Sequence, residues 1–169
     1  MTSSLLFSSE FKDEQLSYIS SFIESLELKI NELEELEKVN VYYISEGGKN
    51  DLADCITDIL NKYQEQIVLI GSGFLFSNGL IVFTRFKGEK RLLPNAIGMI
   101  HVSGFLTHTR DLNRENTYDQ TQQLQLEDVN KEIIKLFTPI LTKEELNRVI
   151  ANEEVYLSNK RLKQMFKIK

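Results

Sequence analysis

Apolar residues recur along this chain at helical spacing in some segments and as short continuous runs in others. Between Asp13 and Lys38 the helical spacing predicts an amphipathic helix with a solvated acidic face. The same spacing predicts a helix over 50–63, capped by Asn50 or Asp51, with Cys55 on the buried apolar stripe.

Four short apolar runs, at 3–8, 39–45, 66–72 and 97–104, predict buried strands. Strands of this kind that alternate with helices are typical of α/β proteins with a largely parallel sheet. A turn that contains Ser77 follows the third run, and a helix is expected over 79–86.

The C-terminal third is predicted to be mainly helical. The charged segment 87–91 is expected to be a hinge and the polar segment 105–123 a loop. A helix is predicted over 122–141, and Thr142 with Glu145 forms a capping-box pattern for the next one. Ser158 occupies the cap position of a short basic C-terminal helix.

Composition restricts the choice of partners. The chain has 169 residues, which suits one domain, and a formal net charge of −5. Its basic residues are scattered, which argues against nucleic acid and anionic membranes as partners. A single cysteine, Cys55, and an N-terminus without a basic segment favour a cytoplasmic protein. The uncharged window 66–84 approaches the length of a membrane span, but its glycines, serines and asparagine favour a strand followed by a helix.

Candidate catalytic residues lie where buried strands end. Gly47 and Gly48 follow the strand 39–45, Ser77 follows 66–72, and His101 lies near the end of 97–104. Loops at this edge of a parallel sheet commonly form an active cleft. A serine nucleophile needs an imidazole base and backbone N–H donors for its oxyanion. Ser77 and His101 fit these roles.

Gly48 and Asn78 are the candidate N–H donors, since a Gly-Gly turn and the first turn of a helix can both direct an N–H into a cleft. Simpler interpretations stay open at this point. A serine in a glycine-rich turn can be a helix cap, and a histidine in an apolar strand can be a core residue.

Three motifs appear in order: ISEGG at 44–48, GFLFSNG at 73–79 and RLLPNAIGMIH at 91–101. They resemble the proteolytic subunit of the Clp protease, which carries Ser-Pro-Gly-Gly, then Gly-x-Ala-Ala-Ser-x-Gly around its nucleophile, then Leu-Pro-Asn and Met-Ile-His. The resemblance is strongest over 39–104 and weak after residue 105. It also includes LLFSSEF near the N-terminus and EEVYLS at 153–158.

The resemblance implies a single crotonase-like α/β domain over 1–169, with the helix 122–141 as a handle where two rings meet and a C-terminal tail. It implies a serine endopeptidase that works without a cofactor, inside a homo-oligomeric ring, on peptides or unfolded proteins. The third triad member would be Glu154, next to the matching run at 156–158. Glu153 and Asp128 are the alternatives for that role.

Several departures from the family pattern favour an alternative, a catalytically silent Clp-like subunit that acts as a scaffold or modulates an active paralogue. Glu46 stands where the family has proline, and the bulky residues 74–76 are expected to fill part of the pocket beside Ser77. The segment that meets the family's ATP-driven unfoldase is expected to be absent, which argues against that partner. A third hypothesis is a crotonase-fold enzyme for acyl thioesters.

Neither a metal site nor a nucleotide site is predicted. The two histidines, His101 and His108, lie seven positions apart without a cysteine cluster, and His108 is expected to be a loop residue. The chain contains no phosphate-binding glycine pattern.

Overall fold

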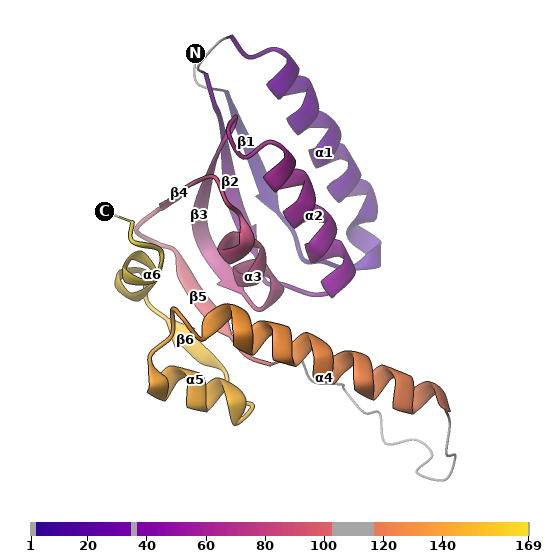
Figure 1. Ribbon diagram of the computed structural model, residues 1–169. Coiled ribbons are helices and arrows are strands. Elements are labelled where there is room, and N and C mark those ends of the chain that lie inside the picture. Colours follow the sequence, from indigo (N-terminus) through magenta and orange to yellow (C-terminus); the bar gives the residue numbers. More distant parts are fainter. Residues whose placement is uncertain (1–2, 35–36, 103–116, 169) are drawn as a thin grey trace. The chain divides into compact units, whose positions relative to one another are not determined.

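The computed structural model describes residues 3–34, 37–102 and 117–168, with side chains described from residue 126 onward in the last range (Figure 1). The chain divides into two compact units. The first contains Met1–Ile100 and Tyr156–Lys169, and the second contains His101–Val155. His108 lies outside the described residues.

The first unit is built on a parallel sheet, in agreement with the sequence prediction. The strands follow the order β1-β2-β3-β5-β6, and β4 also pairs with β3. In the described part of the chain, β1 with β2, β2 with β3, and β3 with both β4 and β5 are paired in parallel. The strand bounds are β1 Ser4–Ser8, β2 Val39–Ser45, β3 Ile67–Phe76, β4 Glu89–Leu92, β5 Ile97–Ile100 and β6 Val155–Leu157.

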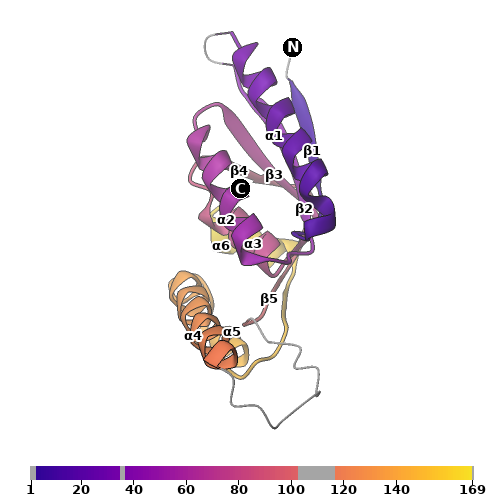
Figure 2. The same cartoon turned by 90° about the vertical axis from the view of Figure 1, so that its right-hand side faces the viewer.

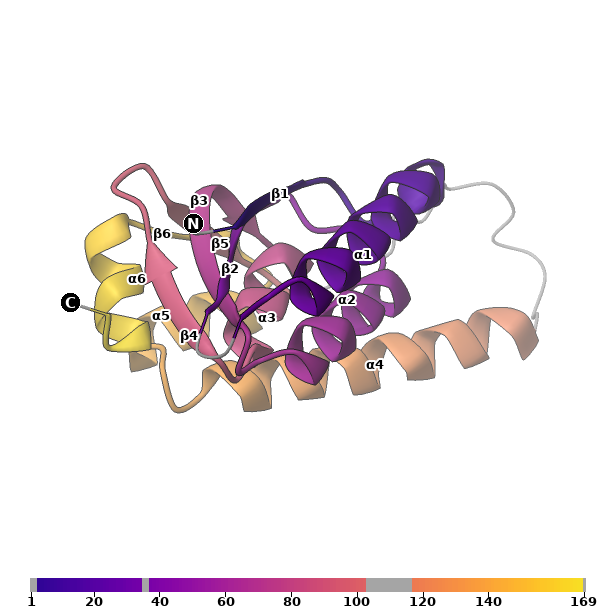
Figure 3. The same ribbon diagram turned by 90° about the horizontal axis from the view of Figure 1, so that it is seen from above.

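Helices α1 and α2 lie side by side on one face of this sheet (Figures 1 and 3). The Glu27 carboxylate of α1 accepts hydrogen bonds from Lys62 and Tyr63 at the end of α2. Helix α1 also lies against β1 (Figure 2). The Tyr18 hydroxyl of α1 accepts from the Ser8 N–H and donates to the Leu6 carbonyl of β1. The helical bounds in this unit are η1 Asp13–Gln15, α1 Leu16–Asn31, α2 Asn50–Lys62, α3 Asn78–Arg85 and α6 Asn159–Phe166.

An aromatic cluster joins the edge strand β1 to its neighbours. The Phe7 ring stacks on Tyr43 of β2 with 5.3 Å between centroids, and it meets Phe22 of α1 edge-on at 4.9 Å. Phe7, Phe11 and Tyr43 have no exposed surface. Because full burial of such a side chain contributes about 2–3 kcal/mol, the cluster fixes β1, and with it Phe11, against the end of β2.

Two helical predictions need correction. Helix α1 ends at Asn31 rather than Lys38, because the acidic residues that follow interact unfavourably with the negative C-terminal end of the helix dipole. Cys55 is exposed rather than buried. The buried face of α2 is formed by Ala53, Ile56, Thr57 and Leu60. Thr57 can lie there because its hydroxyl donates to the Ala53 carbonyl.

The charged segment predicted as a hinge forms β4 instead. Its residues pair with β3 from Val68 with Glu89 to Gly71 with Leu92. Charged side chains suit a short, exposed strand of this kind. The uncharged window 66–84 consists of a strand and a helix, as predicted. No helix in the described ranges is long and apolar enough to cross a membrane.

The second unit contains α4 Thr117–Phe137 and α5 Lys143–Ile150. Helix α4 begins before the predicted residue 122, so the loop prediction is wrong for 117–123. The rest of the predicted loop, 105–116, lies outside the described residues. The capping box is confirmed: the Thr142 hydroxyl accepts from the Glu145 N–H, and the Glu145 carboxylate accepts from the Thr142 N–H. Ser158 caps α6 as predicted.

Candidate active site around Ser77

Ser77 lies at the junction between β3 and α3 in an unusual backbone conformation. Its φ is 51° and its ψ is −124°, a region that residues with a side chain rarely adopt. Such strain costs about 1–3 kcal/mol and is concentrated at functional sites. The Ser77 carbonyl accepts from the Leu80 and Ile81 N–H groups, so the helix begins directly after the serine.

The Ser77 hydroxyl makes no capping hydrogen bond to α3, and the side chain is half-buried. Ser77 thus occupies the N-cap position of α3 without capping the helix through its side chain. A strand, a sharp strained turn and a helix together form the elbow that carries the nucleophile in many serine hydrolases.

A bulge in β3 leads into this elbow. The register with β2 runs from Tyr43 opposite Gly71 to Ser45 opposite Leu75, so β3 carries extra residues here. Gly73 adopts a φ of 57° within the bulge. Bulges re-aim side chains near active sites, and this one extends β3 to Phe76, beyond the predicted end at residue 72.

The Gly47-Gly48 turn lies directly against the elbow. A Cβ added to Gly47 would lie 2.8 Å from both the Phe76 carbonyl oxygen and Ser77 Cβ, and 2.9 Å from the Asn78 nitrogen. The φ angles of Gly47 and Gly48 are 96° and 125°. Only glycine fits both the angle and the spacing at Gly47. The structure therefore brings three predicted site residues, Gly48, Ser77 and Asn78, into one region of the first unit.

Three of the four backbone N–H and C=O groups of Gly47 and Gly48 make hydrogen bonds. The Gly47 N–H donates to the Ser45 hydroxyl, and the Gly47 carbonyl accepts from Phe11 at 2.6 Å. The Lys49 N–H donates to the Phe11 carbonyl on the other side of Gly48. Within the described residues no hydrogen bond takes up the Gly48 N–H, and Gly48 is exposed. This N–H is available to a ligand.

The Asn78 side chain makes contacts that the sequence did not reveal. Its amide nitrogen donates to the Gly48 carbonyl at 2.5 Å and to the Asn50 side-chain oxygen at 2.6 Å. Asn50 was predicted to cap α2, and this is wrong: the N-cap is Lys49, which makes no side-chain capping bond. A capping-type asparagine after a Gly-Gly turn is the only sequence signal of this role.

His101 directly follows Ile100, the last residue of β5, and is half-buried at the start of the second unit. Within the first unit, β5 runs beside the end of β3: Phe76 is in register with Met99, and the Ser77 N–H donates to the Met99 carbonyl at 2.8 Å. The role of His101 as the base for Ser77 is a proposal.

The three candidate acids lie in the second unit, where Glu154 is exposed and directly precedes β6. The two alternatives are engaged elsewhere. The Glu153 carboxylate accepts from Arg148 at 2.8 Å, and Asp128 pairs with Lys131 at 3.0 Å. The choice of Glu154 among the three candidates is a proposal.

The bulky residues 74–76 before Ser77 differ in their burial. Leu75 has no exposed surface and belongs to the core, whereas Phe74 is 44% exposed. The Phe76 ring lies 5.0 Å from that of Phe74 and 5.9 Å from that of Tyr156. The expectation that all three side chains fill a pocket beside Ser77 is therefore wrong for Leu75.

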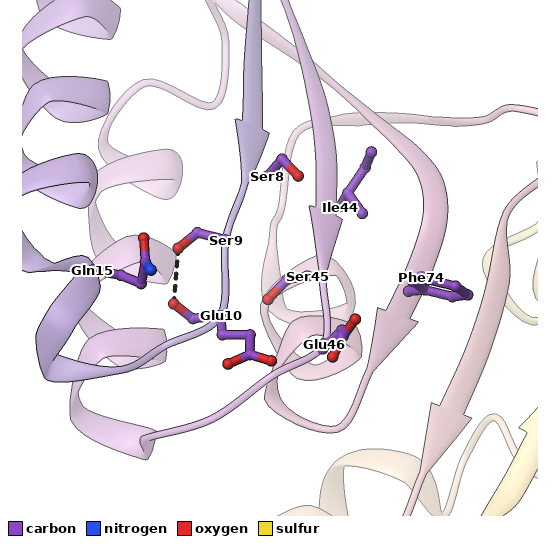
Figure 4. A pocket seen from close by; sticks show the side chains of 8 residues that line it. All are labelled: Ser8, Ser9, Glu10, Gln15, Ile44, Ser45, Glu46 and Phe74. Carbon is purple, nitrogen blue, oxygen red and sulfur yellow. Dashed lines mark hydrogen bonds between the residues drawn. The ribbon is translucent and has the colours of Figure 1, made fainter.

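An open cleft of about 430 Å³ lies at the ends of β1, β2 and β3 (Figure 4). Ile44 and Phe74 form apolar parts of its wall, and Glu10 and Glu46 carry carboxylates at its edge. A hydrogen bond from Lys12 lowers the pKa of Glu10. Ser77 does not line this cleft. The described residues contain no group of three His, Cys, Asp or Glu side chains that could hold a metal ion.

The parallel sheet and the strained serine at a strand–helix elbow define an α/β protein with a hydrolase-like elbow. The model of one family, described as Clp protease, matches residues 3–151. The chain belongs to the Clp protease family.

Curated relatives match over a short stretch. ATP-dependent Clp protease proteolytic subunit 3 from Rhizobium johnstonii, and the protein of the same name from Rhizobium etli, are each 30% identical over 66 residues. The match covers 38% of this chain and spans about a third, 34%, of each relative. A solved structure, a ClpP1 point mutant from Listeria monocytogenes, is 18% identical, with a TM-score of 0.70 over 96% of this chain and 86% of that one. The last comparison confirms the predicted fold.

Proposed function

We propose that the chain is a serine peptidase of the Clp type. Ser77 is the nucleophile, His101 the general base and Glu154 the carboxylate that orients the imidazole. The observation that carries this proposal is the strained backbone of Ser77 at the β3–α3 junction, with a hydroxyl that does not cap the helix. A scaffold has no need of a costly backbone conformation at one serine.

In the proposed reaction, Ser77 Oγ attacks the carbonyl carbon of the scissile peptide as His101 accepts its proton. The tetrahedral intermediate collapses, and His101 gives that proton to the departing amine. Water, deprotonated in turn by His101, then releases the acid product and regenerates Ser77. The intermediate carries its negative charge on the former carbonyl oxygen, which requires donors beside Ser77.

Two backbone groups are proposed as these donors. The Gly48 N–H has no partner among the described residues, and the Asn78 N–H belongs to the first turn of α3, where helices leave N–H groups without acceptors. The positive end of the helix dipole adds to this field. Each oxyanion donor contributes about 3 kcal/mol to such reactions.

Assembly into a homo-oligomeric ring that encloses the sites is part of the proposal, with α4 as the contact between rings. Exposed large apolar side chains on the strands of the first unit support it, since association of subunits would remove their surface from water. They include Leu6 at 57%, Phe74 at 44%, Ile97 at 37% and Tyr156 at 62% exposure. A native mass of one chain would contradict this part.

Hydrolysis of fluorogenic peptides tests the proposed activity. Short peptides need no unfolding, so the assay requires no ATP-driven partner. Turnover should be lost in Ser77→Ala and retained in Ser72→Ala, a matched change in β3, the strand that precedes Ser77. If the wild-type assembly is folded but inactive, the proposal fails and the silent-subunit alternative is favoured. Thioester turnover that persists in Ser77→Ala would instead support the crotonase hypothesis.

A further inference from the structure

We propose that Phe11 is a positioning residue: its backbone N–H holds the peptide group between Gly47 and Gly48, so that the Gly48 N–H faces the oxyanion formed on attack by Ser77. This inference rests on the proposed function and adds a role for a residue that the proposed reaction does not use.

The Gly47 carbonyl and the Gly48 N–H belong to the same peptide group. A trans peptide group is planar, and its C=O and N–H bonds point in nearly opposite directions. The Gly47 carbonyl accepts a hydrogen bond from the Phe11 N–H at 2.6 Å. This bond directs the carbonyl toward Phe11, and the Gly48 N–H therefore points away from Phe11.

The rest of the Phe11 backbone also restrains the turn. Phe11 and Gly48 form an isolated parallel bridge, and the Phe11 carbonyl accepts from the Lys49 N–H at 2.7 Å. The two backbone groups of Phe11 thus bind the peptide groups on both sides of Gly48. A Cβ added to Gly48 would lie 2.4 Å from the Phe11 carbonyl oxygen. Glycine allows this close approach, and Phe11 in turn restricts the conformational freedom that two glycines bring.

Phe11 is itself fixed by the core of the first unit. Its ring has no exposed surface, and the centroid of that ring lies 6.0 Å from the centroid of the Phe7 ring. The segment that joins them runs beside the end of β2, where the Ser9 N–H donates to the Ile44 carbonyl (Figure 4). Core packing therefore holds the donor that orients the Gly48 peptide. A misplacement of about 1 Å in a catalytic group can reduce the rate about 100-fold.

The bond from Phe11 also makes the Gly48 N–H a better donor. A hydrogen bond to the carbonyl polarises the peptide group, and successive hydrogen bonds strengthen one another. The proposed series runs from the Phe11 N–H through the Gly47–Gly48 peptide to the oxyanion. The gain is larger for a full negative charge than for the neutral carbonyl of the substrate, so it lowers the barrier and leaves substrate binding nearly unchanged.

An ester in place of the amide at position 11 tests the inference. Phenyllactate incorporated into the full chain replaces the Phe11 N–H by an oxygen atom and keeps the ring and the carbonyl. We expect kcat to fall about 10- to 100-fold with little change in KM. The affinity for a peptide boronate, which mimics the tetrahedral intermediate, should fall by the same factor as kcat/KM.

The matched control is the corresponding ester at position 49. It removes the Lys49 N–H, which also bonds to Phe11 but belongs to the peptide group that follows Gly48. Each ester removes one backbone hydrogen bond between Phe11 and the turn, so the two should lower the melting temperature by similar amounts. The ester at position 49 should keep kcat within about three-fold of wild type. General damage to the turn would lower kcat equally in both proteins.

Two side-chain variants test the anchor of the Phe11 amide. Phe11→Leu reduces the packing that holds it, whereas Phe22→Leu changes a residue of α1 that packs on Phe7 in the same cluster. We expect Phe11→Leu to lower kcat and boronate affinity about 3- to 10-fold. Phe22→Leu should keep both within about two-fold of wild type.

Two failures can be told apart. If wild-type protein hydrolyses peptides, and the ester at position 11 changes kcat and boronate affinity less than about two-fold, or no more than the ester at position 49 does, the positioning role is overturned and the peptidase stands. If the ester proteins do not fold, the two leucine variants decide by the same criterion. If folded wild-type protein neither hydrolyses peptides nor binds the boronate, the proposed function and this inference fall together.

Discussion

The backbone N–H of Ser77 donates a hydrogen bond to the carbonyl oxygen of Met99, over 2.8 Å. Met99 belongs to β5 and is in register with Phe76, the last residue of β3. His101 follows Met99 by two positions. The main chain therefore holds the elbow in register with the strand that leads to the proposed base.

Removal of the strain at Ser77 should stabilise the fold. Glycine adopts positive φ without a steric penalty, so Ser77→Gly should be about 1 kcal/mol more stable than Ser77→Ala. Thermal or urea unfolding at fixed protein concentration measures the difference. At Ser20, exposed in the middle of α1, the order should reverse, with glycine about 1 kcal/mol less stable than alanine. The same order at both positions would show that Ser77 is not strained.

Contact between the Gly-Gly turn and the elbow can be tested with alanine. At Gly47 a Cβ would lie within 2.9 Å of three atoms of the elbow, whereas at Gly73 the nearest atom would be 3.6 Å away. Both positions have positive φ. Gly73→Ala should therefore cost about 1–2 kcal/mol from backbone strain alone, and Gly47→Ala should cost more and abolish hydrolysis. Equal costs would argue against close packing at Gly47.

The identity of the acidic triad member follows from three amide substitutions. Glu154→Gln should lower kcat by about 1,000-fold or more, because the imidazole loses its orienting charge. Glu153→Gln and Asp128→Asn should retain most activity, since those carboxylates pair with Arg148 and Lys131 on the surface. Peptide hydrolysis by the three variants measures this. A larger loss for Glu153→Gln would reassign the role.

Lys90 should make stability depend on alkaline pH. Burial lowers its pKa to about 8, and its amine donates to the Thr84 carbonyl near the Phe166 ring. An unfolded lysine keeps its proton up to about pH 10.4. Between pH 8 and 10 the unfolded state thus binds more protons, and stability rises with pH.

Urea unfolding at several pH values compares wild type with Lys90→Met. The stability of wild type should rise relative to the variant from pH 8 to 10, and the difference should stay constant below pH 8. Lys87→Met, at an exposed position, is the control. A constant difference between wild type and Lys90→Met over the whole range would contradict the shifted pKa.

Elements encoded by local patterns could be predicted from the sequence. Strand β2 and the capping box at Thr142 were both found from neighbouring residues. Strand β4 was missed because its charged residues carry no strand pattern, and only pairing with β3 makes it a strand. Cys55 was predicted to be buried, but it is exposed, and Thr57 lies on the buried face of α2 instead. The Thr57 hydroxyl donates a hydrogen bond to the Ala53 carbonyl, which allows its burial.

The site was predictable in its residue types but not in its geometry. Gly48, Ser77 and Asn78 were identified from strand ends and from the resemblance to a family. The strained angles of Ser77 follow a bulge in β3 that appears only in the pairing with β2. The contact of Asn78 with Asn50 joins residues 28 positions apart. No local pattern reports a contact of that range.

The proposed peptidase activity depends most on a nucleophilic hydroxyl at Ser77. Reaction with a fluorophosphonate, followed by peptide mass spectrometry of the folded wild-type protein, tests it directly. We expect one adduct, on Ser77, that disappears in Ser77→Ala and is strongly reduced in His101→Ala. A folded protein that takes up no label, or that carries the label on another serine, would contradict the account.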